Sequence, residues 1–209
     1  MPESRFIHLR LHSEYSITDG IVRLDDAVAR AVSYGMPALA LTDLANFFGL
    51  VKFYSSARGM GVKPVLGADV CIANASDPDR PYRLLLLCRS RQGYLQLCEL
   101  LTQAYLAPRI RGRAEITHQM LREIGVDGLI ALSGAGNGDI GEALLQGNRE
   151  QAASRARDWA SLFSDAFYLE VQRVHPRGQP QQESLIAATV HLASELELPL
   201  VATHPIQFL

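Results

Sequence analysis

The sequence of 209 residues has few cysteines, no long apolar run and no excess of one charge. Its three cysteines, Cys71, Cys88 and Cys98, show no CxxC spacing, so neither a disulfide framework nor a zinc ribbon is expected. The longest apolar run, LLLLC at 84–88, is much too short to span a bilayer. The start, MPESRFIHLR, lacks the apolar core of a signal peptide. These absences predict a cytoplasmic protein with no membrane partner.

The charge is nearly balanced, with 20 Lys and Arg against 22 Asp and Glu. No polybasic run is present, so direct binding of this chain to DNA is not favoured. The 48% hydrophobic content suffices for one well-buried domain, or at most two small ones. We expect a single domain over residues 1–209.

Short apolar runs alternate with helical patterns along most of the chain. The runs lie at 6–12, 38–43, 63–73, 83–88, 128–134, 166–172 and 198–204, and most are apolar almost throughout, as in strands buried on both faces. Helical spacing occupies 24–35, 91–106 and 182–197. A polar turn, not a helix, joins the runs 63–73 and 83–88. The order predicts an α/β fold with a mainly parallel, seven-stranded sheet.

Such a sheet either closes as a barrel or stays open and doubly wound. Polar residues stand at the carboxyl ends of the predicted strands: His12, Asp43, Asp69, Ser133, Glu170 and His204. Barrel enzymes place their chemistry there, whereas an open sheet concentrates it at a switch point. The glycine-rich SGAGNGDIG at 133–141 lacks the G-K-[ST] ending of a phosphate loop, so we interpret it as a strand-to-helix turn. The pattern favours a barrel.

The first predicted strand contains an unusual combination, HLRLHSEYS at 8–16. Alternation places His8, Arg10 and His12 on one face, with Asp19 close behind. Two imidazoles and a carboxylate indicate a metal site. Arginine is always protonated, however, so Arg10 cannot ligate a metal and would repel one.

Four segments resemble the N-terminal PHP (polymerase and histidinol phosphatase) domain of bacterial replicative DNA polymerase III α subunits, in its proteobacterial form. They are FIHLRLHSEYSITDG, GMPALALTDLANFFGLVKFYSSARGMGVKPVLGAD, GLIALSG and LPLVAT. The resemblance implies a distorted seven-stranded β/α barrel that continues past residue 209. It also implies a larger subunit whose polymerase palm, thumb and fingers lie outside this chain. Two partners follow from it: the remainder of the α subunit and the proofreading exonuclease subunit ε.

Metal-binding relatives of this type hold up to three ions at the strand ends, and the resemblance identifies the matching positions here. Three keep a residue able to ligate: His12, Asp19 and Asp69. Six have lost theirs: Arg10, Leu44, Arg83, Ala135, Pro205 and Gln207. Three remaining ligand residues cannot hold three ions that also keep open coordination positions for water and substrate. We therefore expect no catalytic residue and no cofactor. One alternative stays open: the site binds a single Mn, Zn or Mg ion weakly, with His204 as a fourth ligand.

Without metals, the carboxylates of Asp19, Asp43 and Asp69 would face one another. We hypothesise that Arg10 and Arg83 replace the charge of the metals, because guanidinium groups bind carboxylates without an ion. The preferred function is a catalytically silent domain that holds the polymerase subunit together, docks ε, and reaches DNA only through the holoenzyme. The alternative is a residual metal-dependent phosphoesterase, nuclease or pyrophosphatase.

The remaining polar residues are interpreted as structural. His8 is expected to be structural, and His118, His175 and His191 are expected at the surface. Ser13 is expected to bond backbone in the turn that follows His12. Glu170 is expected to line the barrel mouth and to pair with Arg83 or Arg173.

Overall fold

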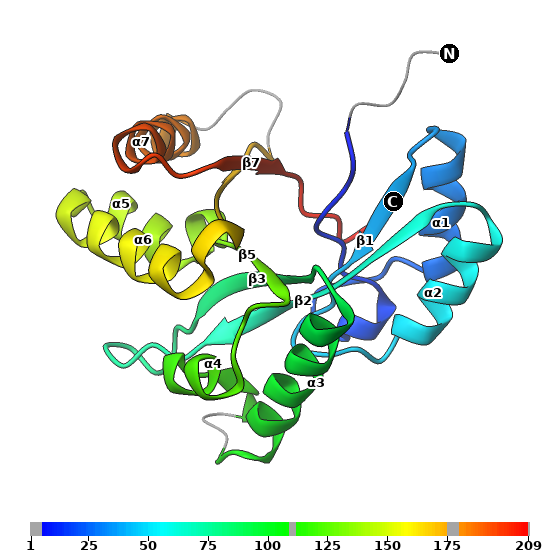
Figure 1. Ribbon diagram of the computed structural model, residues 1–209. Helices are drawn as coiled ribbons and strands as arrows, with labels where there is room; N and C mark the ends of the chain where they lie inside the picture. The colour runs from blue at the N-terminus through cyan, green and yellow to red at the C-terminus, as the bar shows by residue number, and fades with distance from the viewer. Residues whose placement is uncertain (1–5, 109–111, 175–179, 209) are drawn as a thin grey trace. The chain divides into compact units, whose positions relative to one another are not determined.

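The computed structural model describes residues 6–108, 112–174 and 180–208 (Figure 1). The chain divides into two compact units. The first contains the chain up to Asp69 together with His204 and the residues after it, and the second is Val70–Thr203. The single domain expected over 1–209 stays a prediction.

The first unit is built on two parallel strands flanked by two helices. In chain order it contains η1 (Glu14–Ser16), α1 (Leu24–Ser33), β1 (Ala38–Leu41), α2 (Leu50–Gly59) and the start of β2 (Lys63–Ile72). The register of β1 and β2 runs from Ala38 opposite Lys63 to Leu41 opposite Leu66. All four residues of β1 are buried, as the apolar run predicts for a strand covered on both faces.

The strand predicted at 6–12 is replaced by an extended segment with isolated bridges. Its backbone lies beside β1, through Ala40 N–H to His8 O at 2.9 Å. It also pairs in parallel at Leu11 with Ile206. The prediction of a regular strand is wrong because the hydroxyl of Thr42 accepts the Leu11 N–H at 2.9 Å. A side chain thereby takes a bond that a sheet ladder would give to a carbonyl.

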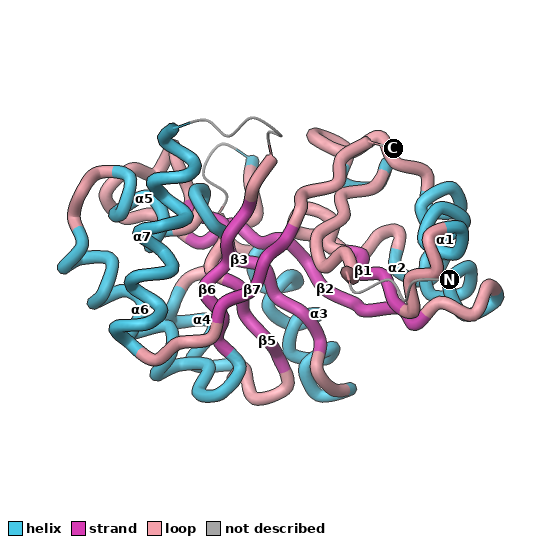
Figure 2. Tube along the Cα trace, turned by 90° about the horizontal axis from the view of Figure 1, so that it is seen from above, coloured by secondary structure: helices cyan, strands magenta, loops and turns pink. Residues whose placement is uncertain are grey.

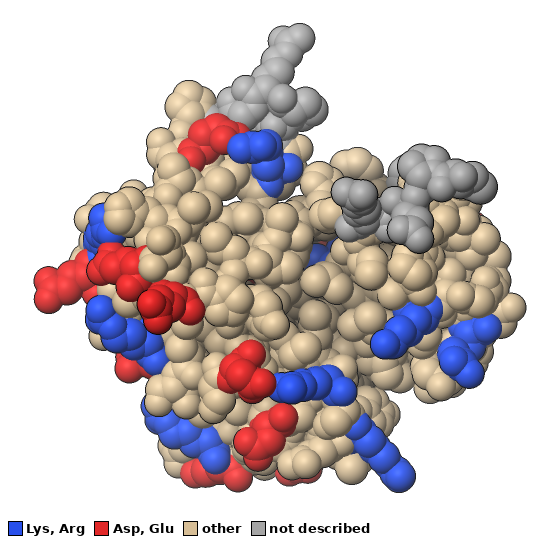
Figure 3. Space-filling view, turned by 45° about the horizontal axis from the view of Figure 1, so that its top comes forward, with Lys and Arg blue, Asp and Glu red and all other residues tan. Residues whose placement is uncertain are grey.

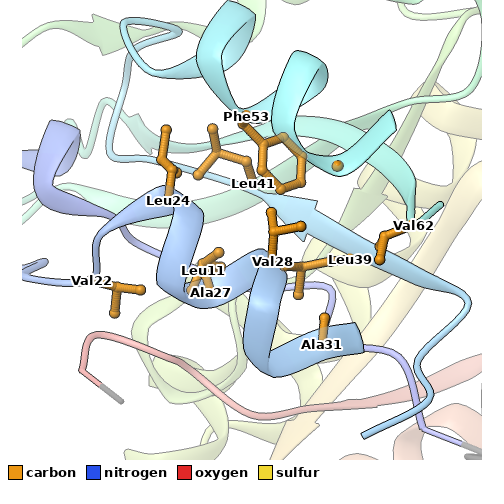
Figure 4. Close-up of a cluster of buried hydrophobic side chains, with 11 residues drawn as sticks. Leu11, Val22, Leu24, Ala27, Val28, Ala31, Leu39, Leu41, Phe53 and Val62 are labelled. Carbon is orange, nitrogen blue, oxygen red and sulfur yellow. The ribbon is translucent and has the colours of Figure 1, made fainter. Parts of the chain in front are cut away.

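The core of the first unit lies between α1, α2 and β1 (Figure 4). It consists of apolar side chains that are almost fully buried: Leu11, Val22, Leu24, Ala27, Val28, Ala31, Leu39, Leu41, Phe53, Ala57 and Val62. The α1 members recur at spacings of three and four, which places them on one helix face. Gly35 follows the end of α1 with φ of 65°, and Met36 N–H bonds back to Ala31 O at 2.9 Å. This glycine ends the helix as the sequence indicates.

The second unit contains the end of β2 and the rest of the sheet. Its elements are β3 (Tyr82–Cys88), α3 (Arg91–Leu106), β4 (Glu115–Ile116), α4 (His118–Ile124), β5 (Leu129–Leu132), η3 (Ala135–Asn137), α5 (Asp139–Leu145), α6 (Arg149–Phe163), η4 (Ser164–Ala166), β6 (Phe167–Gln172), α7 (Pro180–Leu196) and β7 (Leu200–Thr203). Helices α5, α6 and α7 pack together beside β6 (Figure 2). None of the described helices is long and apolar enough to cross a membrane.

Strands follow the order β1-β2-β3-β5-β6-β7, with β4 paired to β2. The pairs β5–β6 and β6–β7 are parallel, whereas β3 and β5 are antiparallel. Among the described strands the sheet is therefore mainly parallel, as predicted, with β3 as an antiparallel exception next to β5. The cause is the direct turn from β2 to β3, because only a long crossover returns a strand in the same direction.

Candidate functional site

The first unit brings Arg10, His12, Asp19 and Asp69 together. Arg10 Nη1 donates to Asp69 Oδ2. His12 Nε2 lies 3.1 Å from the same oxygen, and His12 Nδ1 lies 2.9 Å from Asp19 Oδ2. Arg10 is 6% exposed, His12 4% and Asp69 2%. All three positions that keep a family ligand thus lie in one cluster, with Arg10 in contact with them.

The charge of His12 decides what this cluster can bind. Burial by itself would lower the pKa of His12, but hydrogen bonds to Asp19 and Asp69, together with their charges, raise it to about 9. At neutral pH the ring is therefore an imidazolium that donates from both nitrogens. The cluster contains two cations, Arg10 and His12, opposite two anions. His12 is a second charge-balancing group, which the sequence did not reveal.

The contacts of His12 and Asp69 argue against a family-type metal cluster at these residues. A metal needs the neutral imidazole lone pair, and both nitrogens of His12 are engaged with carboxylates. The oxygen Asp69 Oδ2 already accepts from Arg10, whose guanidinium cannot be deprotonated to make room. Among residues 6–108, 112–174 and 180–208, no group of three or more His, Cys, Asp or Glu is arranged to hold an ion.

Asp43 lies in the same unit in a network of neutral donors. Its carboxylate accepts from Ser13 N–H at 2.6 Å, Ser13 Oγ at 2.9 Å and Ser16 Oγ at 3.1 Å. Burial raises the pKa of Asp43, against the lowering effect of these bonds and of the charge of His12. Ser13 also accepts from Tyr15 N–H, which confirms its predicted backbone bond. The partners of Asp43 were missed, and the S-x-x-S spacing of Ser13 and Ser16 is the signal that could have indicated them.

The loop that carries Asp19 has a strained backbone. Ile17 adopts φ of 68° and ψ of −48°, and Thr18 N–H bonds to Ser16 O at 2.7 Å, which is a γ-turn with positive φ. A β-branched residue is unfavourable there. Ile17 is 75% exposed, so side-chain burial does not offset the strain. A Cβ on Gly20 would lie 2.3 Å from Ser13 O, so this position needs glycine. The loop is held in the shape that presents Asp19 to His12.

Arg83 and Glu170 lie in the second unit. Arg83 Nη1 contacts Cys71 Sγ at 3.5 Å. Glu170 is 1% exposed and accepts from Gly134 N–H at 3.0 Å, Gln172 Nε2 at 3.0 Å and Thr203 Oγ1. Its carboxylate therefore ties the turn after β5 to β6 and β7.

The glycine-rich segment is the strand-to-helix turn that the sequence predicts, running from β5 through η3 to α5. Within it, Ala135 has φ of 48°, a strained value for a non-glycine residue. At the surface, Arg173 binds Glu183 through two bonds of 2.7 Å. Arg173 is thus engaged by Glu183, although it was one of the two partners predicted for Glu170.

The histidines outside the cluster have distinct environments. His204 is exposed, and its ring lies 6.4 Å from that of His8. Burial, followed by the charge of His204, lowers the pKa of His8. His118 is half-buried against Trp159 at 4.3 Å between ring centroids, so its surface prediction is wrong. His191 is exposed as predicted, and His175 lies outside the described residues.

The family model and the sequence relatives indicate the same family for this chain. The model of the PHP domain family matches residues 8–174. The chain is 49% identical over 210 residues to the DNA polymerase III subunit alpha of Neisseria meningitidis serogroup A, and 39% identical over 209 residues to that of Escherichia coli K12. All of this chain is covered in both cases, but only 18% of each relative.

Two solved structures resemble the fold at 14% sequence identity. An amidohydrolase from Chromobacterium violaceum, with bound SO4 and no metal, gives a TM-score of 0.61 over 96% of this chain and 87% of its own. A protein from Bifidobacterium adolescentis described as a metal-dependent phosphoesterase gives 0.58 over 100% and 90%. At this identity the likeness concerns the fold, and it confirms the predicted α/β class.

Proposed function

Because the chain belongs to the PHP domain family, we propose that it is the N-terminal PHP domain of a replicative polymerase α subunit, and that this copy is catalytically inactive. One observation carries the inactivity: Arg10 and His12 occupy Asp69 Oδ2, and His12 also binds Asp19. Metal-dependent phosphoester cleavage needs ligands with free lone pairs and open coordination positions. Here the ligating groups neutralise one another.

In this proposal the domain acts in the cytoplasm as a structural part of a larger subunit. The chain spans less than a fifth of the length of the polymerase relatives, so polymerisation belongs to the remainder. On the face that Figure 3 shows, basic side chains are scattered among acidic ones. This mixture supports contact with DNA only through the complete holoenzyme.

The test of inactivity is metal analysis of the full-length protein with hydrolysis assays on phosphoesters and pyrophosphate in Mn²⁺ and Zn²⁺. We expect substoichiometric metal and no hydrolysis above that of an Asp69→Asn variant. Asp165→Asn is the control, because Asp165 lies at the surface opposite Arg89. Stoichiometric metal, with hydrolysis that Asp69→Asn abolishes and Asp165→Asn does not, would establish the alternative phosphoesterase.

We also propose that the domain docks the exonuclease subunit ε, as the family resemblance implies. Support comes from the relatives, which are 39–49% identical over this chain and are named DNA polymerase III subunit alpha. The test is a titration of the full-length protein with purified ε. Binding is expected to be saturable, and its absence at tens of micromolar would contradict the proposal.

A further inference from the structure

A hollow of about 300 Å³ lies in the second unit, at the carboxyl ends of β5 and β6. Residues of η3, of the end of α5, of β6 and of the first half of α7 line it. The volume is at the lower end of the range of about 300–1,000 Å³ that small-molecule sites occupy. The hollow is therefore of a size for one small ring compound.

Residues with side-chain amides line this hollow on two sides. They include Asn137 in η3 and both Gln181 and Gln182 in the first turn of α7. The atom Gln182 Oε1 is buried and has no hydrogen-bond partner within the described residues. A buried acceptor that is left unsatisfied lowers the stability of a folded chain, so each one calls for an explanation. Next to an open hollow, the explanation is a bound molecule that supplies the donor.

The charges at the hollow favour a neutral ligand. Among the described residues that line it there is no Lys or Arg, and the charged residue is Glu170. The carboxylate of Glu170 is 1% exposed and is held by Gly134, Gln172 and Thr203. An anion placed here would face this carboxylate without a cation to offset the repulsion. The absence of a cation agrees with the interpretation of the glycine-rich segment at 133–141 as a turn and not as a phosphate loop.

Aliphatic side chains supply the apolar part of the lining, with Leu145 from α5 and both Leu185 and Ile186 from α7. Gly136 in η3 keeps space open on the opposite side, because a Cβ at this position would lie 3.2 Å from Leu185 Cδ2. In the same turn, the positive φ of Ala135 is strained, and strained residues cluster at ligand sites. Aliphatic groups suit the faces of a planar ring, and amides suit its polar edge.

We propose that this hollow binds the base of a free adenine nucleoside, a neutral planar ring with an amino group beside a ring nitrogen. Gln182 accepts from the amino group through Oε1 and donates to the ring nitrogen through Nε2, which is the bidentate pairing that glutamine makes with adenine. The ring packs against Leu185 and Ile186. A free nucleoside is favoured over a DNA strand, because no Lys or Arg among the described lining residues would hold a phosphate backbone. The inference goes beyond the proposed function, since it invokes neither catalysis nor the ε subunit.

The first experiment is photolabelling of the full-length protein with 2-azidoadenosine, mapped peptide by peptide with mass spectrometry. We expect a label on peptides from η3 or α7 that unlabelled adenosine displaces. Purine riboside, which lacks the amino group, should displace it roughly ten-fold less well, because the bidentate pairing is lost. No label on these peptides, or equal displacement by purine riboside, would overturn the proposal. Stronger displacement by oligodeoxyadenylate than by adenosine would also overturn it, because the ligand would then be a DNA strand.

The second experiment removes the pairing groups with Gln182→Leu in the full-length protein. The control is Gln92→Leu, which is exposed on α3 and outside the hollow. We expect Gln182→Leu to lose the label about ten-fold and Gln92→Leu to keep it. Without nucleoside, Gln182→Leu should not speed hydrogen exchange in α7, because it removes an unsatisfied buried acceptor. Equal labelling of the two variants would overturn the proposal, and so would faster exchange, because Oε1 would then have a partner in the free protein.

A third variant fills the hollow from α7. Ile186→Trp places a large ring in it, whereas Val190→Trp, one turn further along the helix, lies outside it at a position that is 45% exposed. We expect Ile186→Trp to abolish the label and Val190→Trp to leave it unchanged. Unchanged circular dichroism establishes that each variant is folded. Undiminished label in folded Ile186→Trp would overturn the proposal.

Discussion

Asp69 and Asp43 are both buried carboxylates of the first unit, but their surroundings differ. Asp69 faces two cations, Arg10 and His12, whereas the named partners of Asp43 are a backbone N–H and two serine hydroxyls. Ion pairing holds His12 protonated to a pKa of about 9, while burial raises the pKa of Asp43. The difference indicates that a buried carboxylate at a strand end can be stabilised either by neighbouring cations or by the oriented dipoles of N–H and O–H groups. The contrast lies in the hydrogen-bonding partners, because the charge of His12 also lowers the pKa of Asp43.

Removal of a counter-charge from Asp69 is expected to have the largest effect. Arg10→Ala leaves an anion buried at 2% exposure beside His12, and should lower the free energy of unfolding by about 3–5 kcal/mol. Arg157→Ala, at an exposed position, is the control and should change it by less than about 0.5 kcal/mol. Urea denaturation at pH 7 measures both. Equal losses would mean that Arg10 does not balance Asp69.

The charge on His12 makes stability depend on alkaline pH. Its pKa is about 9 in the folded chain against 6.5 unfolded, so its contribution is complete below pH 6.5. That contribution, roughly 3 kcal/mol, is lost as the pH rises from 6.5 through 9.

The measurement is the free energy of unfolding at pH 6 and pH 9.5 for the native protein and for His12→Gln. The native protein should lose more stability than the variant over this range. Parallel losses would show that the pKa of His12 is the same in the folded and the unfolded chain. An NMR titration of the ring reports the pKa directly.

Local patterns predicted α1, α3 and α7 well, because spacing and end signals lie within each segment, whereas no helical range was predicted over α2, α4 or α6. The spacing over 91–106 coincides with α3, and Gly35 ends α1. Features that depend on residues distant in sequence could not be predicted from local patterns. The irregular path of 8–12 depends on the hydroxyl of Thr42, and the two residues of β4 are too few for a periodic signal.

The sequence predicted which residues form the candidate site, but it predicted only some of the interactions among them. Alternation along 8–12 and the family resemblance placed Arg10, His12 and Asp69 together. The protonation of His12 could not be predicted, because it depends on two carboxylates that reach it from separate segments. The same holds for His8 and His204, which are far apart in sequence but adjacent in the first unit.

Changes to the network of Asp43 are expected to have smaller effects than those at Asp69. Asp43→Asn keeps one acceptor oxygen but cannot accept every serine bond, so it should cost about 1–2 kcal/mol. Ser16→Ala should cost roughly 1 kcal/mol, since Ser16 Oγ also accepts from Leu44 N–H at 2.9 Å.

The control for this network is Ser33→Ala, at an exposed position of α1. The measurement is again urea denaturation at pH 7. A loss at Asp43→Asn as large as that at Arg10→Ala would show that the charge of Asp43 is balanced by a cation. The contrast with Asp69 would then disappear.

The smallest effect concerns the γ-turn that presents Asp19. Ile17→Gly removes the positive-φ strain, so it should leave the free energy of unfolding unchanged or raise it by up to about 1 kcal/mol. Ile21→Gly is the matched control, because Ile21 is 77% exposed and its φ is not positive. It should lower stability by roughly 0.5–1 kcal/mol through backbone entropy. Equal losses would mean that Asp19 reaches His12 without backbone strain, whereas opposite signs would show that the ion-paired cluster holds the turn in place.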